Sequence, residues 1–179
     1  MGEELRGARV ALRPVAAGDR PLLRRWFGDR ELRGFIGRQP AVGPRSGQGA
    51  DPHDAQFLIL LWDGQRPIGV CGLFGISWIE RTAEVGILLG EKDTWGHGYG
   101  PEALRVLVDH ARDELGLSRI SLCVHATNTR AIRAYEKVGF VVEQRLTVGR
   151  WLFGRGVEIL VMALPERAAA SAVGMRRRT

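Results

Sequence analysis

Three glycines alternate with other residues in the segment Gly96 to Gly100, between a predicted strand and a predicted helix. Because glycine has no Cβ, the backbone N–H groups of such a loop can turn inward and approach a ligand closely. The following helix presents the positive end of its dipole to the same point. The segment therefore predicts a phosphate or pyrophosphate site, although a plain strand-to-helix turn can show the same alternation.

The residues on either side place this loop in the fold. Residues 82–89 (TAEVGILL) predict a strand. After the loop, Pro101 is expected at the first helical position, where its missing N–H has no consequence. Apolar residues then recur at helical spacing until Gly116, which predicts the helix end. The loop thus lies at the carboxyl end of a strand and the amino end of a helix, where an anion is favoured.

A second motif follows the predicted strand 119–125 (RISLCVH). It covers residues 128–140 (NTRAIRAYEKVGF) and begins with Asn128, a residue type that caps helix N-termini. One apolar stripe runs through the predicted helix, and Gly139 is expected to close it before another strand. The motif therefore predicts a short amphipathic helix between two strands.

The two motifs, in this order and about one helix plus one strand apart, resemble the GNAT superfamily of acetyl-CoA-dependent N-acetyltransferases. The pattern Asn-x-x-Ala-x-x-x-Tyr-x-x-x-Gly-Phe from Asn128 to Phe140 is more specific than the glycine loop. Residues 83–104 (AEVGILLGEKDTWGHGYGPEAL) resemble the branch that holds ribosomal-protein alanine acetyltransferases and antibiotic-modifying acetyltransferases. The resemblance covers about residues 8–164, including the strand order.

The remaining segments fit that family's fold. A short helix is expected after Asp19, with Leu23 and Trp26 on its buried side. Further strands are predicted over residues 8–13, 56–62, 67–78, 140–145 and 157–163. We expect a single α/β (α+β) domain over residues 1–165, with one mixed, mostly antiparallel sheet of about seven strands and helices on both faces. Residues 166–179 are expected to form a basic, disordered tail.

The resemblance implies how acetyl-CoA would bind. Backbone amides of the glycine loop would hold the pyrophosphate, and backbone groups of the preceding strand would hold the pantetheine. His97 is expected to face solvent or the cofactor rim. The implied cofactor-binding residues are Leu88, Leu89, Trp95, Gly96, His97, Gly98, Tyr99, Gly100, Asn128 and Ala131.

Trp95 departs from the family pattern, which commonly has Arg or Gln at that position. A side-chain contact to phosphate is therefore expected to be lost. Lys92, Arg130 or Arg133 could replace it, and the sequence does not choose among them.

Acetyl transfer to an amine needs a base for the amine and an acid for the departing thiolate. Tyr135 matches the family position whose phenol protonates the thiolate; the alternative is a core aromatic on the helix face. Glu84, on the strand before the loop, is the candidate base. It could instead bind a cationic substrate or pair with Arg81, and Glu80 is a second candidate.

Composition argues against a nucleic-acid-binding, membrane-spanning, secreted or metal-binding protein. The net charge of the 179-residue chain is +6, but residues 166–179 carry four Arg against one Glu, and no basic face with aromatic platforms indicates nucleic acid. No apolar run approaches the roughly 20 residues of a membrane span, and the amino terminus shows no secretory signal, so a cytoplasmic location is expected. Cys71 and Cys123 are expected to be free thiols, and no histidine shows metal-ligand spacing.

Three functions therefore remain at this point. The first is an acetyltransferase acting on a primary amine, either a protein amino terminus or a small amine such as an aminoglycoside, as a monomer or homodimer. The second is a non-catalytic acyl-CoA-binding module, which would need no proton donor at Tyr135. The third, nucleotide binding, lacks a Gly-Lys-Ser/Thr ending. The Gly/Pro-rich segment 34–55 is expected to be either a substrate lid or disordered.

Overall fold

The computed structural model describes residues 4–33, 53–62, 65–149 and 156–166. The strands are β1 (Leu5–Arg6), β2 (Val10–Pro14), β3 (Ala55–Leu61), β4 (Arg66–Ser77), β5 (Thr82–Leu89), β6 (Arg119–His125), β7 (Val141–Val148) and β8 (Val157–Ala163). The helices are α1 (Arg20–Gly28), α2 (Arg30–Arg33), α3 (Tyr99–Asp109) and α4 (Thr129–Val138). Short 3-10 turns cover Ala17–Asp19 and Lys92–Thr94, and a π-helical turn, His110–Glu114, follows α3.

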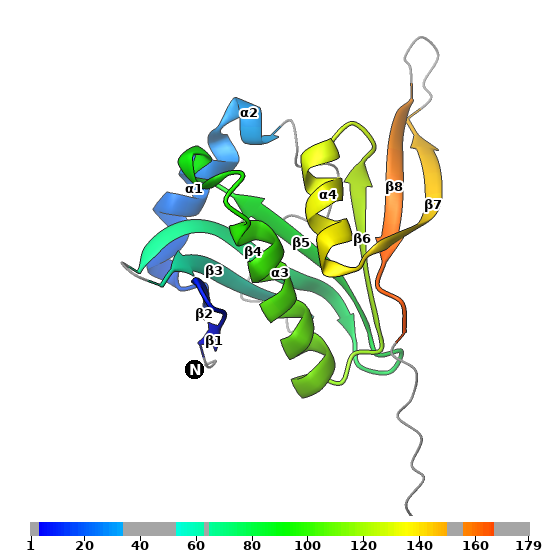
Figure 1. Ribbon diagram of the computed structural model, residues 1–179, viewed down its shortest axis with the longest axis horizontal. Coiled ribbons are helices and arrows are strands. Elements are labelled where there is room, and N and C mark those ends of the chain that lie inside the picture. The colour runs from blue at the N-terminus through cyan, green and yellow to red at the C-terminus, as the bar shows by residue number, and fades with distance from the viewer. Residues whose placement is uncertain (1–3, 34–52, 63–64, 150–155, 167–179) are drawn as a thin grey trace, which may run out of the picture.

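All eight strands form one sheet in the order β1-β2-β3-β4-β5-β6-β8-β7 (Figure 1). Every neighbouring pair is antiparallel except β5 and β6, which run parallel. The mixed, mostly antiparallel sheet is confirmed. It has one strand more than the seven expected, because the two residues of β1 pair with β2 and are too few to show a periodic pattern.

The parallel pair opens into a wedge. Strands β5 and β6 pair over only three residues each, from Thr82–Arg119 to Glu84–Ser121. Beyond that point β5 continues to Leu89 along β4, while β6 continues to His125 along β8. The two strands therefore diverge at their carboxyl ends, beside the glycine loop.

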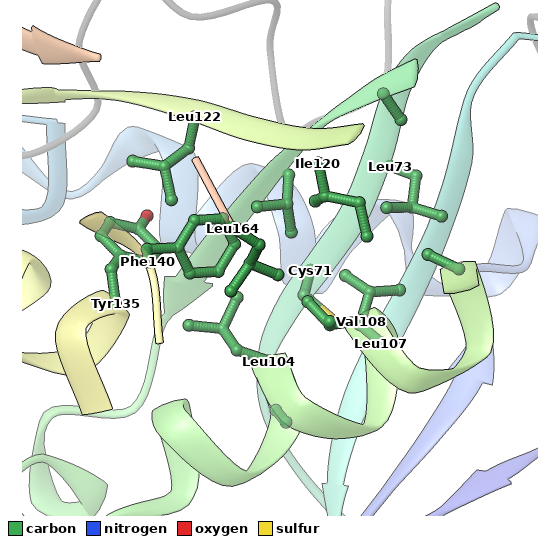
Figure 2. Packing of buried hydrophobic residues seen from close by; sticks show 14 of the residues in the cluster. Cys71, Leu73, Leu104, Leu107, Val108, Ile120, Leu122, Tyr135, Phe140 and Leu164 are labelled. Carbon is green, nitrogen blue, oxygen red and sulfur yellow. The ribbon is translucent and has the colours of Figure 1, made fainter. Parts of the chain in front are cut away.

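Helices cover both faces of the sheet, as expected. On one face α3 and α4 pack on the main apolar cluster, which includes Leu104, Leu107, Ile120 and Tyr135 (Figure 2). On the other face Leu23 and Trp26 of α1 and Leu32 of α2 form a second cluster with residues of β2 to β5. In Figure 1, α3 and α4 lie in front of the sheet, and α1 and α2 lie at the end opposite β7 and β8.

The predicted helix ends are largely confirmed. The Asn128 side chain accepts a hydrogen bond from the Ala131 N–H at 3.2 Å, which is the expected cap. Gly139 ends α4 with a φ of 107°, a left-handed conformation that glycine adopts without strain. Helix α3 begins two residues earlier than expected, so Pro101 is its third residue; the N–H groups of the first turn have no helical partner there either.

Asp19 precedes α1 as expected, but its carboxylate does not cap that helix. It accepts hydrogen bonds from the Arg13 guanidinium and, at 2.7 Å, from the Ala16 N–H. These bonds close the 3-10 turn that comes before α1.

Neither of the two cysteines, both within the described residues, forms a disulfide. Cys71 is on β4 and Cys123 is on β6, with β5 between them, as the resemblance implied. Burial raises the pKa of the Cys71 thiol. Within the described part of the chain, no helix is long and apolar enough to span a bilayer, and no cluster of three His, Cys, Asp or Glu side chains is suited to a metal ion. Most of the predicted 34–55 loop, and residues 167–179 of the predicted tail, lie outside the described residues.

Candidate active site

The wedge between β5 and β6 opens into a cleft of about 330 Å³. One wall is the end of β5, from Ile87 to Leu89, and the other is the end of β6, from Cys123 to His125. The glycine loop closes one side, and α4 closes another. The cleft therefore lies where the sequence predicted an anion site, between a strand end and a helix start.

The glycine loop has the backbone conformation that its sequence predicts. Gly96 and Gly98 have φ of 82° and 84°, values that side-chain-bearing residues rarely adopt. Gly98 is the N-cap of α3, so the first free N–H groups of that helix follow it directly. A Cβ on Gly100 would point toward Leu89, whose Cδ1 would lie 3.5 Å away. Gly96, Gly98 and Gly100 all line the cleft, so their amides are placed to meet an anion there.

Arg9 fixes the loop from outside the cleft. Its guanidinium donates hydrogen bonds to the Glu102 carboxylate at 2.9 Å and to the His97 carbonyl at 3.0 Å. The same guanidinium lies 4.9 Å from the centre of the Tyr99 ring. Burial opposes ionisation of Glu102, but the hydrogen bonds from Arg9 outweigh it and lower the pKa of this carboxyl. Arg9 therefore ties the start of the sheet to both ends of the loop.

The Trp95 ring positions the guanidinium of Arg130 at the cleft. Its indole N–H donates to the Leu89 carbonyl at 3.1 Å, which holds the ring across the end of β5. The Arg130 guanidinium stacks on that ring, 3.5 Å from its centre. Arg130, Arg133 and Lys137, all on α4, line the cleft, whereas none of the described residues that line it is acidic. The cleft is therefore electropositive and suited to a polyanion.

The structure separates Lys92 from the other candidate phosphate contacts. The Lys92 ammonium lies 2.7 Å from a Glu31 oxygen and 3.0 Å from an Asp29 oxygen. It is not among the residues that line the cleft, whereas Arg130 and Arg133 are. Of the three candidates, these two are placed to reach a ligand in the cleft.

Tyr135, on α4, is a buried residue that lines the cleft. The residue is 4% exposed, and its ring packs edge-on against Phe140, with ring centres 5.8 Å apart (Figure 2). Burial raises the pKa of the Tyr135 phenol to about 12. The phenol therefore keeps its proton at neutral pH, which suits a proton donor.

Glu84 lies on the other face of the sheet. It is the last β5 residue that pairs with β6, so it marks the apex of the wedge. Its neighbours along the strand, Ala83 and Val85, belong to the cluster beneath α3 and α4, whereas Glu84 lines a second cavity of about 590 Å³. Asp54 and Glu80 also line that cavity, and Arg119, the one Arg among the described residues that line it, is paired with Glu143. The second cavity is therefore rich in carboxylates.

A model of the acetyltransferase (GNAT) domain family matches residues 9–141, more than half of the chain. The chain belongs to the GNAT acetyltransferases. It is accordingly an acetyl-CoA-dependent N-acetyltransferase, and the α+β fold seen here is that of the family.

Relatives of this acetyltransferase match it over most or over part of its length. It is 25% identical over 177 residues to the Bacillus licheniformis protein named "Uncharacterized N-acetyltransferase p20", over 94% of this chain and 99% of that protein. It is 29% identical over 108 residues to the Bacillus subtilis (strain 168) protein named "Putative ribosomal N-acetyltransferase YdaF", over 60% of this chain and 58% of that protein.

A solved structure shares the fold. Spermidine N-acetyltransferase from Vibrio cholerae, crystallised in complex with CoA and spermine, matches this acetyltransferase with a TM-score of 0.74. The match covers 88% of this chain and 95% of that chain at 22% sequence identity.

Most of the residues that the sequence predicted for the site meet at one cleft in this acetyltransferase. Those that line it are Leu88, Leu89, Trp95, Gly96, Gly98, Tyr99, Gly100, Asn128, Ala131 and Tyr135. His97 does not line it: its ring stacks on Tyr99 at 5.9 Å, and its Nδ1 lies 3.0 Å from the Trp95 carbonyl. Glu84 belongs to the second cavity.

Sequence reasoning missed the β6 wall of the cleft and the Arg9 clamp. Cys123 and His125 line the cleft only because β6 turns away from β5 after Ser121. Arg9 contacts Glu102, 93 residues further along the chain. The alternation of residues 119–125 does signal a strand with two distinct faces, but no local pattern shows where its pairing stops.

Proposed function

We propose that acetyl-CoA binds in the first cleft and that a primary amine enters the second cavity and attacks the thioester directly. The observation that carries this proposal is the opposite charge of the two spaces. The cleft is lined by Arg130, Arg133 and Lys137 and by no described carboxylate, whereas the second cavity is lined by Asp54, Glu80 and Glu84. Phosphates favour the first environment and an alkylammonium ion favours the second.

The two spaces approach each other along β6, next to the apex of the wedge. Glu84 and its partner Ser121 line the second cavity, while Cys123, two residues further along β6, lines the cleft. A pantetheine arm that runs along the diverging end of β5 would bring its thioester to this apex. Holding both reactants there converts a bimolecular step into an intramolecular one.

The proposed step uses one acid and one base. The neutral amine nitrogen attacks the thioester carbonyl carbon, and a tetrahedral intermediate forms. As the C–S bond breaks, the Tyr135 phenol gives its proton to the thiolate. The proton lost by the amine passes to Glu84, directly or through water. Because Tyr135 and Glu84 lie on opposite faces of the sheet, the acid and the base approach the thioester from different sides.

Two acceptor types fit a cavity of this kind, a protein amino terminus and a small amine such as an aminoglycoside or polyamine. The names of the relatives point both ways, since one refers to ribosomal N-acetylation and another, a Vibrio cholerae protein, to spermidine. All of these acceptors present a primary amine that is positively charged at neutral pH. The carboxylates of the second cavity suit each of them.

A panel assay tests the proposal. The full chain is mixed with acetyl-CoA and with peptides, polyamines, aminoglycosides or amino acids, and both free CoA and acetylated product are measured. We expect product with at least one primary amine, in equal amount to the CoA released. Tight acetyl-CoA binding with no product from any acceptor would instead support the non-catalytic acyl-CoA-binding module.

A further inference from the structure

The last two strands present an exposed apolar face. In an antiparallel pair, residues directly opposite each other point to the same face. Leu146 is opposite Ile159, and Val148 is opposite Val157. Val142 is opposite Met162, which belongs to the cluster beneath α3 and α4, so Val142 points to the helix side. We define the β7–β8 face as the side away from these helices; its apolar residues are Val141, Leu146, Val148, Val157, Ile159 and Val161.

This face differs from an ordinary solvent-facing sheet surface, which alternates polar residues outward. Leu146, Val148 and Val157 are 43%, 46% and 44% exposed. Two of the three charged residues of these strands, Arg145 and Glu158, pair with each other on the helix side. The third, Glu143 at the bulge of β7, is neutralised by Arg119 at the start of β6. Contiguous exposed apolar residues of this kind mark a binding surface.

The β7–β8 face continues directly from the carboxylate-lined cavity. Across the sheet, Glu84 lies opposite Ser121, which lies opposite Ala163. One row further along β6, Cys123 lies opposite Val161. Adjacent strands are about 4.8 Å apart. Ala163 in turn lies opposite Val141, so the apolar face reaches the row of Ser121, which lines the carboxylate-lined cavity. The face also begins one strand away from Cys123, which lines the first cleft.

The next row extends the face away from the cavity. His125, which also lines the cleft, lies opposite Ile159, which lies opposite Leu146. Between Ala163 and Val157, the two ends of β8, the strand spans about 20 Å. An extended peptide of about six residues spans the same length. A compact small amine would not reach across it.

We propose that the β7–β8 face binds the apolar side chains of an extended peptide whose amino terminus lies in the cavity beside Glu84. This inference rests on the proposed function and narrows its acceptor to a peptide amino terminus followed by apolar residues. The carboxylates of the cavity bind the terminal ammonium group, and the β7–β8 face covers the apolar side chains that follow.

Matched acceptors test the inference. We would compare a hexapeptide that begins with Ala and has Leu or Val at positions 2 to 5, a second that has Ser at those positions, alanine methyl amide, and spermidine. Product formation is followed with the full chain at saturating acetyl-CoA. We expect kcat/KM for the apolar peptide to exceed that for the serine peptide by at least about tenfold, with spermidine below both, because burying even one large aliphatic side chain accounts for such a factor.

The exposed residues of β7 supply a matched pair of variants. Leu146→Asn alters the β7–β8 face, and Val142→Asn alters the helix side of the same strand at a similar exposure, 40% against 43%. Leu146→Asn should lower the ratio of apolar-peptide to serine-peptide kcat/KM by about fivefold or more, through KM, while Val142→Asn leaves the ratio unchanged.

Three results would overturn the inference. Equal kcat/KM for the two peptides, or faster turnover of spermidine, would leave acetyl transfer intact but remove the apolar peptide as acceptor. A wild-type dimer that Leu146→Asn converts to monomer in sedimentation, with peptide kinetics unchanged, would assign the face to a second copy of the chain. No product from any acceptor, including alanine methyl amide, would overturn the proposed function together with this inference.

Discussion

The Glu102 carboxylate accepts hydrogen bonds from both the backbone and the side chain of Arg9. The Arg9 N–H donates to Glu102 Oε1 at 2.6 Å, and the Arg9 Nε donates to Oε2 at 2.9 Å. Glu102 lies in the first turn of α3, just after the glycine loop, and Arg9 lies just before β2. The pair therefore holds the start of α3, and with it the loop amides, against the beginning of the sheet.

Replacing Arg9 should weaken acetyl-CoA binding without unfolding the protein. In Arg9→Ala the loop loses the bond to the His97 carbonyl and the side-chain bonds to Glu102, so its amides are less well ordered before ligand binds. We expect the acetyl-CoA Kd to rise by about three- to tenfold in calorimetric titration. Arg6→Ala is a suitable control, because Arg6 packs on Trp62, outside the loop. Equal Kd values for both variants would show that the clamp has no effect on the site.

The Arg9–Glu102 pair also predicts that the stability of the fold decreases at acidic pH. The pKa of Glu102 in the folded chain is below its ordinary value of 4.5, so the ionised pair stabilises the fold fully above that value. This stabilisation is lost as the pH falls through the lower folded pKa. The difference in unfolding free energy between the wild type and Glu102→Gln should therefore shrink as denaturant titrations move from pH 7 to pH 3. A difference that stays constant over this range would contradict the assignment.

A methyl group at Gly100 should block the cofactor while leaving the fold intact. The added Cβ would lie 3.5 Å from Leu89 Cδ1, an ordinary contact distance, and Gly100 is within a helix, where Ala is favoured by about 1 kcal/mol. Because Gly100 lines the cleft in which we propose that acetyl-CoA binds, the methyl group should occupy space that the pyrophosphate needs. Gly100→Ala should keep or raise the Tm and raise the acetyl-CoA Kd by at least about tenfold.

Gly28→Ala provides the comparison for this variant. An added Cβ at Gly28 meets nothing within 4 Å, and Gly28 is not part of the cleft lining. Its acetyl-CoA Kd should equal that of the wild type. If Gly100→Ala also binds acetyl-CoA normally, the pyrophosphate lies elsewhere, and Gly98→Val becomes the stricter test of the loop.

Arg130 should act on cofactor affinity through charge. It stacks on Trp95 and lines the cleft, whereas Lys92 is paired with Asp29 and Glu31. Arg130→Ala should raise the acetyl-CoA Kd by about tenfold and reduce its dependence on salt, since one charge-assisted contact is lost. Lys92→Ala should change neither quantity. Titrations at two salt concentrations distinguish these results from a general loss of stability.

Local signals in the sequence predicted the elements that surround the site. Asn128 and Gly139 marked the two ends of α4, and the strands 82–89, 119–125 and 157–163 have the predicted bounds. Each of these depends on a cap, a turn residue or a period of two within a few residues. Strand β7 is longer than predicted, since it extends to Val148 along β8, a pairing that its own sequence does not reveal.

The rest of the site depends on contacts between distant segments. The wedge exists because Ser121 is the last β6 residue that pairs with β5, and nothing in the composition of β6 changes at that point. Nothing in the sequence around Arg9 indicates a role at the site, because that role depends on its contact with the distant Glu102. That Glu84 and Tyr135 occupy opposite faces likewise follows from the sheet order and from where α4 packs, neither of which a residue pattern encodes.

Removing the Tyr135 hydroxyl should slow turnover without changing the core. Tyr135→Phe keeps the edge-on contact with Phe140 and the 4% exposure of the ring. We expect kcat to fall by roughly 10²-fold, the lower range for a positioned acid, with an unchanged acetyl-CoA Kd. Turnover close to wild type would show that water or another group protonates the thiolate.

The pKa of Tyr135 adds a test of stability. Burial raises it from 10.0 to about 12, so the unfolded chain releases the phenol proton at lower pH than the folded chain. The buried, protonated phenol of Tyr135 therefore contributes fully to the free energy of unfolding below pH 10. This contribution is lost as the pH rises from about 10 to about 12. Tyr135→Phe should lack this component in denaturant titrations at pH 8 and pH 11. Identical pH dependence in both proteins would mean that the phenol is not shielded from water.

Replacing Glu84 should show whether this residue acts as the general base or only binds the substrate ammonium group. Glu84 lies at the apex of the wedge and lines the cavity proposed for the amine. If it accepts the amine proton, Glu84→Gln should lower kcat by about 10² and change the acidic limb of the pH–rate profile, where the amine is mostly protonated and a base has most effect. If it only binds the ammonium group, KM for the amine should rise while kcat changes little.

Glu80→Gln is the matched control, because Glu80 lines the same cavity but precedes the paired part of β5. A Glu84→Gln enzyme with both constants and the acidic limb unchanged would make Glu84 structural, and a larger effect from Glu80→Gln would transfer the role of base to Glu80.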